Sequence, residues 1–178
     1  MSMRKPLVAG VLLAAALGAG AAWAESPGLG KPISEADIKA WDITILPDGT
    51  NLPKGINGTV AAGTKLYEEK GCVACHGPGG TGGANVPLFN PAKLDRIEAP
   101  KSIGNFWAQA TTVFDMIRRA MPWTQPRTLS DQEVYDLTAY VLFLNKLIDE
   151  KDVINSETLP KVKMPNSGNF ITRFPDHI

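Results

Sequence analysis

Gly71-Cys72-Val73-Ala74-Cys75-His76-Gly77 contains both cysteines of the chain. Two cysteines separated by two residues and followed at once by histidine are the attachment pattern of a c-type haem. The spacing lets Cys72 and Cys75 form thioethers at one edge of the porphyrin, and it carries His76 beneath the iron as the proximal ligand. The sequence therefore predicts one covalently attached haem c, held by these three residues.

Two other interpretations of this motif explain fewer of its residues. A disulfide between Cys72 and Cys75, as in thioredoxin-type proteins, lacks the βαβ context of that fold and leaves His76 without a role. A zinc site needs more thiol or imidazole ligands, and His177 is the only other histidine of the chain. Haem attachment is therefore the favoured interpretation.

The second axial ligand is expected to be a methionine, since haem c iron commonly takes Met or His opposite the proximal histidine. Met116 lies inside a predicted helix, where filling the core is the simpler role. Met121 precedes Pro122 in a predicted loop, from which its side chain can turn toward the iron. Met121 is favoured, partly through the resemblance described below, while Met164, His177 or an open position remain as alternatives.

The first 24 residues are predicted to be a signal peptide that is removed in the periplasm. Arg4 and Lys5 form a short basic region, residues 7–22 are apolar, and Ala22-Trp23-Ala24 is a small-residue cleavage site. The alternative is an uncleaved membrane anchor, but the small residues at the end of the apolar run favour cleavage after Ala24. We therefore expect an exported chain with a periplasmic location.

Composition narrows the classes of protein that remain. The 178 residues include 18 basic and 18 acidic side chains, so the basic excess of a nucleic-acid-binding protein is absent. Two cysteines are too few for a disulfide-dense scaffold. The length suits one domain, and no segment after the leader is long and apolar enough to span a membrane.

Turn residues and hydrophobic periodicity divide the rest of the chain into three parts. Residues 25–58 are rich in Gly, Pro and Asp and are predicted to form an irregular arm, with at most a short β-bridge over 43–45. Residues 59–148 are predicted to form the haem domain, and 149–178 a tail that packs on it. Within the domain we expect helices over 59–70, 106–119 and 130–144 joined by a long loop over 77–105, hence an all-α fold. The last helix has a capping-box pattern, with Ser130 and Glu133 three residues apart.

These features identify the chain as resembling a class I cytochrome c. The matching motifs are Gly63-Thr64-Lys65-Leu66-Tyr67, Asn85-Val86-Pro87-Leu88, Met121-Pro122, Leu129-Ser130-Asp131-Gln132-Glu133 and Leu137-Thr138-Ala139-Tyr140. The resemblance implies helices packed around one haem, with Gly63 of the first helix against Tyr140 of the last. It also implies that the carbonyl of Pro87 accepts a hydrogen bond from His76.

A narrower resemblance covers most of the chain after the leader. It is similar to the cytochrome subunits of periplasmic molybdenum enzymes that oxidise sulfite or sulfane sulfur in Sox-type systems. The matching segments are 40–43, 52–55, 103–107, 114–123 and 163–166, although the larger sulfane dehydrogenase cytochromes carry two haem motifs and this chain carries one. The resemblance implies a molybdenum sulfite or sulfane dehydrogenase as electron donor and another cytochrome or an oxidase as acceptor.

Together these features predict an electron carrier rather than an enzyme, because an iron with two axial protein ligands has no open position for a substrate. The alternatives are a free cytochrome shuttle and a haem enzyme that acts on a sulfur compound. Trp107, Arg118 and Arg119 are candidate donors to the haem propionates. The alternative for the two arginines is a solvated helix end that complements the helix dipole.

Overall fold

The computed structural model describes residues 29–170. The predicted signal peptide over 1–24 and His177 therefore lie outside the described residues. The described chain divides into two units, one ending at Ala40 and one beginning at Trp41. The first unit holds most of helix α2 (Glu35–Trp41). Across residues 29–170, no helix combines the length and the apolar character needed to cross a membrane.

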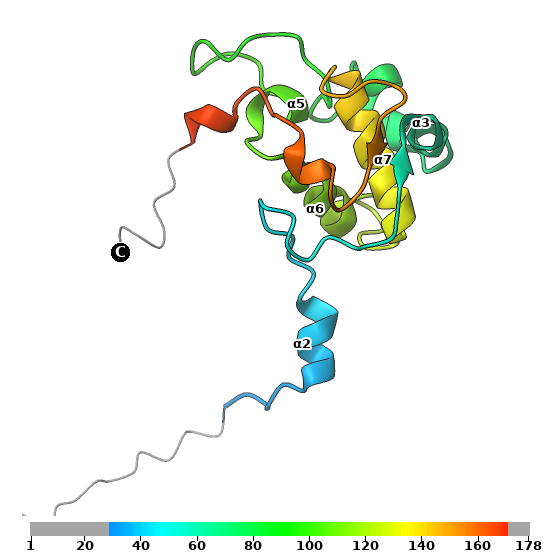
Figure 1. The fold of residues 1–178 in the computed structure, drawn as a ribbon, viewed down its shortest axis with the longest axis vertical. Coiled ribbons are helices and arrows are strands. Elements are labelled where there is room, and N and C mark those ends of the chain that lie inside the picture. The colour runs from blue at the N-terminus through cyan, green and yellow to red at the C-terminus, as the bar shows by residue number, and fades with distance from the viewer. Residues whose placement is uncertain (1–28, 171–178) are drawn as a thin grey trace, which may run out of the picture. The chain divides into compact units, whose positions relative to one another are not determined.

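The second unit is mostly helical, as expected for the all-α class, and Figure 1 shows its elements. In chain order they are β1 (Gly58–Thr59), α3 (Val60–Glu69), α4 (Cys72–His76), η1 (Pro78–Gly80), α5 (Ile103–Phe106), α6 (Ala110–Ala120), α7 (Asp131–Leu144), β2 (Val153–Ile154), η2 (Leu159–Lys161) and η3 (Ser167–Asn169). β1 and β2 form an antiparallel pair with Gly58 opposite Ile154. The β-bridge allowed for residues 43–45 does not form, and the Ile45 amide instead donates to Asp115 at 3.3 Å.

The helix expected over 106–119 is divided in two. The Ser102 hydroxyl accepts a hydrogen bond from the Asn105 amide, and the Asn105 side chain accepts one from the Ser102 amide, so α5 begins earlier than predicted. Trp107 is then extended, with ψ of 141°, which ends α5 after one turn. α6 begins three residues later and carries the apolar stripe that the sequence pattern predicted.

Helices α3 and α7 cross at a glycine. A Cβ atom on Gly63 would overlap the carbonyl group of Asp136 and lie 2.8 Å from Cβ of Tyr140. The rings of Tyr67 and Tyr140 pack beside this point with centroids 5.1 Å apart. The expected contact between Gly63 and Tyr140 is therefore confirmed, and the absent side chain is what permits the close approach.

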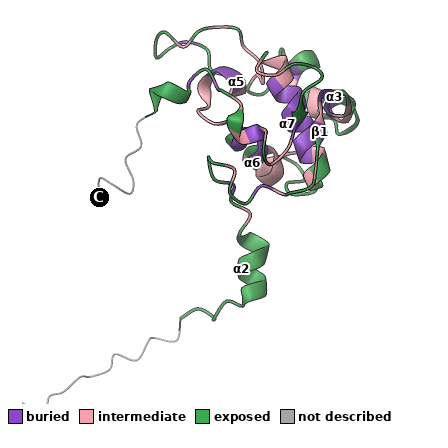
Figure 2. Ribbon diagram, viewed as in Figure 1, coloured by how far each residue is buried: buried purple, intermediate pink, exposed green. Residues whose placement is uncertain are grey.

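Helix α7 is the centre of the core, and Figure 2 shows buried residues along it. Its predicted capping box is confirmed, because the Ser130 amide donates to the Glu133 carboxylate at 2.8 Å and the Ser130 hydroxyl accepts from the Glu133 amide. Lys70 lies 2.6 Å from the same carboxylate, and its hydrogen bond lowers the pKa of Glu133. This ion pair ties the end of α3 to the start of α7.

Segments on both sides of the haem domain contribute to this core. Ile45 and Leu52 are buried before β1, and Ile154, Leu159 and Met164 are buried after α7. The Tyr135 hydroxyl of α7 donates to the carbonyl of Pro53 at 2.8 Å. The described parts of the arm from residue 41 onward and of the tail are thus held by burial and by a few hydrogen bonds, among them those of the two-residue β1–β2 pair.

We predict that Gly63→Ala lowers the free energy of unfolding by about 1–3 kcal/mol, because the added methyl group forces α3 away from α7. Denaturant unfolding of the haem-loaded protein measures this change. Ala61→Ser, at an exposed position of the same helix, is the matched control and should change stability by less than ~0.5 kcal/mol. Equal stability of the Gly63 variant and the wild type would contradict the close crossing.

Candidate functional site

The predicted haem motif lies in the wall of a cavity of about 790 Å³. This volume falls in the range of roughly 300–1,000 Å³ that is usual for cofactor pockets. The lining residues are mostly apolar and come from α3, α4, α5, α6, α7 and the loops between them; they include Tyr67, Cys72, Cys75, His76, Val86, Leu88, Ile103, Trp107, Val113, Met116, Ile117, Met121, Leu137 and Val141. We call this space the motif cavity.

One short helix presents the three motif side chains to the motif cavity. Helix α4 lies between Gly71 and Gly77, whose φ angles of 72° and 78° suit glycine and turn the chain on either side of it. Cys72 and Cys75 are both free thiols. Burial raises the pKa of the Cys72 thiol, whereas Cys75 is exposed. Both sulfur atoms are thus available for the thioether bonds that the motif predicts.

The ring of His76 is oriented by a single hydrogen bond. Its Nδ1 lies 2.9 Å from the carbonyl oxygen of Val86. Because a carbonyl can only accept, Nδ1 carries the proton and Nε2 keeps the lone pair that a metal ligand needs.

The acceptor of this bond is Val86 and not the expected Pro87, which does not line the motif cavity. Backbone bonds anchor the loop on each side, from the Asn85 amide to Cys75 and from the Leu88 amide to Gly80. These bonds set the register of the loop. A proline also holds the residue before it in an extended conformation, so the register presents the Val86 carbonyl.

The structure distinguishes the methionine candidates by whether they line the motif cavity. Met121 follows α6 directly and lines the motif cavity. Met116 lines the same cavity and is 38% exposed, so it does not fill the core as expected. Met164 is buried in the core and is absent from the cavity wall. Met121 and Met116 thus share the cavity with His76.

The structure also distinguishes the expected propionate donors. Trp107 lines the motif cavity, but Arg118 and Arg119 do not. Arg118 forms an ion pair with Asp131 at 3.0 Å. Arg119 makes two hydrogen bonds to Asp115, at 2.9 and 3.1 Å, and this partner raises the pKa of the Arg119 guanidinium. Both arginines are thus paired with carboxylates of α6 and α7. This pairing fits the helix-end alternative better than it fits propionate binding.

The lining residues that were not selected from the sequence as site residues include Lys70, Lys101, Trp123 and Thr124. Trp123 is 78% exposed and Val86 is 60% exposed, so both lie at the rim of the motif cavity rather than inside it. Among the described residues that line the motif cavity, the basic side chains are Lys70, Lys101 and His76. No carboxylate is among them. Trp123 gave a sequence signal through its position beside Met121, whereas Lys70 at the end of a predicted helix and Lys101 in a predicted loop gave none.

The hydroxyl of Tyr67 supports the residue after His76. It is buried and donates to the carbonyl of Gly77 at 2.7 Å. Burial raises the pKa of Tyr67 to about 12, so the hydroxyl stays protonated and remains a donor at neutral pH. α3 therefore fixes the C-terminal end of α4 through this bond.

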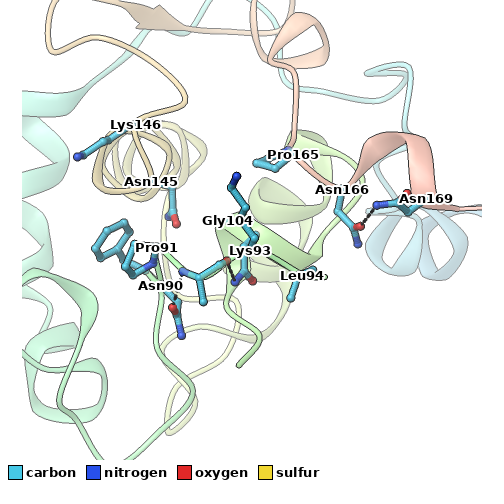
Figure 3. A pocket seen from close by; sticks show the side chains of 13 residues that line it. Asn90, Pro91, Lys93, Leu94, Gly104, Asn145, Lys146, Pro165, Asn166 and Asn169 are labelled. Atoms are coloured by element: carbon cyan, nitrogen blue, oxygen red, sulfur yellow. Dashed lines mark hydrogen bonds between the residues drawn. The ribbon is translucent and has the colours of Figure 1, made fainter. Parts of the chain in front are cut away.

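A second, smaller pocket of about 420 Å³ is lined by residues of the loop after Leu88, of α5, of the end of α7 and of the tail (Figure 3). Its asparagines are engaged in bracing these segments. The Asn105 side chain donates to the carbonyls of Ala92 and Pro100, and the Asn145 side chain donates to those of Leu88 and Val141. No thiol or imidazole lines this pocket, so the chemistry of the motif belongs to the larger cavity.

The residues of the motif cavity fit a covalently bound haem c. Two free thiols, an imidazole with a fixed tautomer and a thioether side chain line one apolar space. This donor set is the one by which class I haem c sites attach and ligate the group.

Two comparisons with known proteins found matches. The family model described as cytochrome c matches residues 60–145. A chain in the crystal structure of the sulfane dehydrogenase SoxCD from Paracoccus pantotrophus is 32% identical, with a TM-score of 0.73, over 85% of this chain and 75% of that chain. No curated protein matches the sequence significantly.

We predict that Tyr67→Phe lowers the free energy of unfolding by about 0.5–1.5 kcal/mol, because it removes a buried hydrogen bond and leaves the Gly80 amide as the remaining donor to the Gly77 carbonyl. Tyr140→Phe is the matched control, since that hydroxyl makes no hydrogen bond within residues 29–170 and the paired rings remain. Denaturant unfolding of both haem-loaded variants checks the difference. Equal losses in the two variants would show that the Gly77 bond contributes nothing of its own.

Proposed function

The chain belongs to the cytochrome c family, whose members transfer electrons through a covalently bound haem c, and from this premise we propose its particular role. It is a periplasmic, monohaem carrier of single electrons. Its donor is a molybdenum sulfite or sulfane dehydrogenase, and its acceptor is another cytochrome or an oxidase.

The observation that carries the monohaem role is the joint presence of the three motif side chains and Met121 in one apolar cavity. Cys72 and Cys75 would hold the porphyrin, and His76 and Met121 would be the axial ligands. When bound, the haem supplies the one-electron Fe(III)/Fe(II) couple. With His76 and Met121 as its two protein ligands, the iron would have no position left for a substrate, which favours a carrier over an enzyme.

The partner is supported by the similarity to the sulfane dehydrogenase chain, which reaches well beyond the region of the family model. The rim of the motif cavity adds a chemical argument. Exposed Trp123 and Val86 offer apolar contact area, and Lys101 and Lys70, which is paired with Glu133, line the same cavity. A partner surface with an apolar centre and acidic edges fits this rim.

The periplasmic location is supported by the leader pattern. It is also supported by the haem motif, because covalent haem attachment to this motif takes place after export in bacteria. The single haem is supported by the occurrence of one Cys-x-x-Cys-His motif in the 178 residues.

We predict that Met121→Leu removes the weak long-wavelength absorption band of methionine-ligated ferric haem and lowers the reduction potential or opens the iron to added imidazole. Met116→Leu and Met164→Leu should retain the band. Optical spectra of the three oxidised, haem-loaded variants distinguish the candidates. Loss of the band in Met116→Leu, with Met121→Leu unchanged, would assign the ligand to α6 instead.

The electron-transfer role is tested by stopped-flow reduction of the oxidised holoprotein. Sulfite or thiosulfate is added with and without the molybdenum dehydrogenase of the same organism. Fast haem reduction only when enzyme and substrate are both present is the expected result, and it also names the substrate. Saturable reduction without the enzyme would indicate a catalytic haem, and no reduction in either case would leave a free cytochrome shuttle.

A further inference from the structure

We propose that residues 29–41 form a docking segment that binds the catalytic subunit of the dehydrogenase. This inference rests on the proposed function and assigns the partner contact to a part of the chain that lies outside the haem domain in sequence. The segment contains α2 and the six residues before it, and three features of it support the assignment.

The start of α2 is specified by its own side chains. The Asp37 carboxylate accepts hydrogen bonds from the Ser34 amide at 3.0 Å and the Ser34 hydroxyl at 2.6 Å, and the Ser34 hydroxyl accepts one from the Asp37 amide. Seven residues are too few for an isolated helix to be stable in water, so this cap biases the segment toward a helix rather than fixing it. A partly formed helix reduces the ordering cost on binding.

The apolar side chains of the segment are exposed. Leu29 is 84%, Ile33 72%, Ile38 49% and Trp41 76% exposed, and α2 has no buried residue, although the Arg127 guanidinium lies over the Trp41 ring at 5.7 Å from its centroid. A single exposed apolar residue is ordinary, but four within thirteen residues are not. Ile38 and Trp41 are three residues apart and share a helix face, and Ile33 and Ile38 occupy the two positions that pack together across a helix N-terminus.

The similarity to the sulfane dehydrogenase chain indicates the occupant. It spans 85% of the chain, about 151 residues, whereas the family model spans 86 residues from 60 to 145. Since 33 residues follow position 145, about 30 or more matched residues must precede position 60. A continuous match of this length includes the docking segment. The similarity to the dehydrogenase chain therefore covers residues 29–41, which lie outside the region matched by the cytochrome c family model.

The recognition mode that fits is a short helix laid in a groove. Ile33, Ile38 and Trp41 would fill an apolar floor. Glu35 and Asp37 in the first turn of α2 are exposed and would face a basic rim. The partner surface is thus an apolar groove about two helical turns long with basic residues at one end.

The test compares binding of mature, haem-loaded variants to the purified molybdenum subunit by titration calorimetry. The double variant Ile33→Glu/Ile38→Glu should weaken binding by at least about tenfold, because hot-spot truncations cost more than ~1 kcal/mol each. Ala36→Glu is the control, since it adds one negative charge on the face of α2 opposite Ile38, where the double variant adds two charges in all, and it should bind within about twofold of the wild type. Haem spectra and thermal unfolding of all three proteins should coincide, because the substituted residues are exposed.

Four outcomes would overturn the docking segment. Tight binding of the double variant, with normal reduction by enzyme and substrate, would refute the segment while the proposed function stands. Equal weakening by Ala36→Glu would assign the effect to charge rather than to the apolar face. A wild type that neither binds the subunit nor is reduced by it would refute the proposed function and the segment together, and a change from dimer to monomer in the double variant would identify a second copy as the occupant.

Discussion

The hydrogen bond from His76 Nδ1 to the Val86 carbonyl joins the two segments that define the motif cavity. One segment is α4, which carries the cysteines, and the other is the loop around Val86. Without this bond the imidazole is free to rotate, and the tautomer that leaves Nε2 unprotonated is no longer selected. The loop in turn depends on α7, because the Asn145 side chain donates to the Leu88 carbonyl at 2.9 Å. The imidazole on a five-residue helix is thus positioned by the longest helix within residues 29–170.

The same dependence explains why α3 and α7 must approach closely. α3 supports the end of α4 through the Tyr67 hydroxyl, and α7 supports the Val86 loop through Asn145. The two supports act on one histidine, so their relative position has to be fixed. Gly63 permits the close crossing because it has no side chain there. The Lys70–Glu133 ion pair adds a second connection near the start of α7.

The sequence was most informative where chemistry depends on neighbours in the chain. The Cys72, Cys75 and His76 motif, the Ser130–Glu133 capping box and the stripe of α6 are local patterns, and the structure contains each of them. The contact between Gly63 and Tyr140 is not local and was expected only through resemblance to a family.

Expectations failed where a distant partner decides the outcome. The acceptor for His76 shifted to Val86 because two backbone bonds set the loop register. Arg118 is held by Asp131 of the next helix, a pairing that no spacing within α6 predicts. β1 pairs with β2 almost a hundred residues later, over two residues each, which is too short to leave a pattern in the sequence.

A near-neutral carrier has little long-range electrostatic guidance toward its partner. The chain has 18 basic and 18 acidic residues, so encounter by overall charge attraction is weak, and productive orientation must come from short-range contacts. The rim around Trp123 and Val86 is a small area for that purpose, and electron transfer requires the complex to dissociate again. The proposed docking segment would separate the two demands. Once bound, it would keep the effective concentration of the haem domain high while the rim contact itself stays weak enough to form and break with each electron.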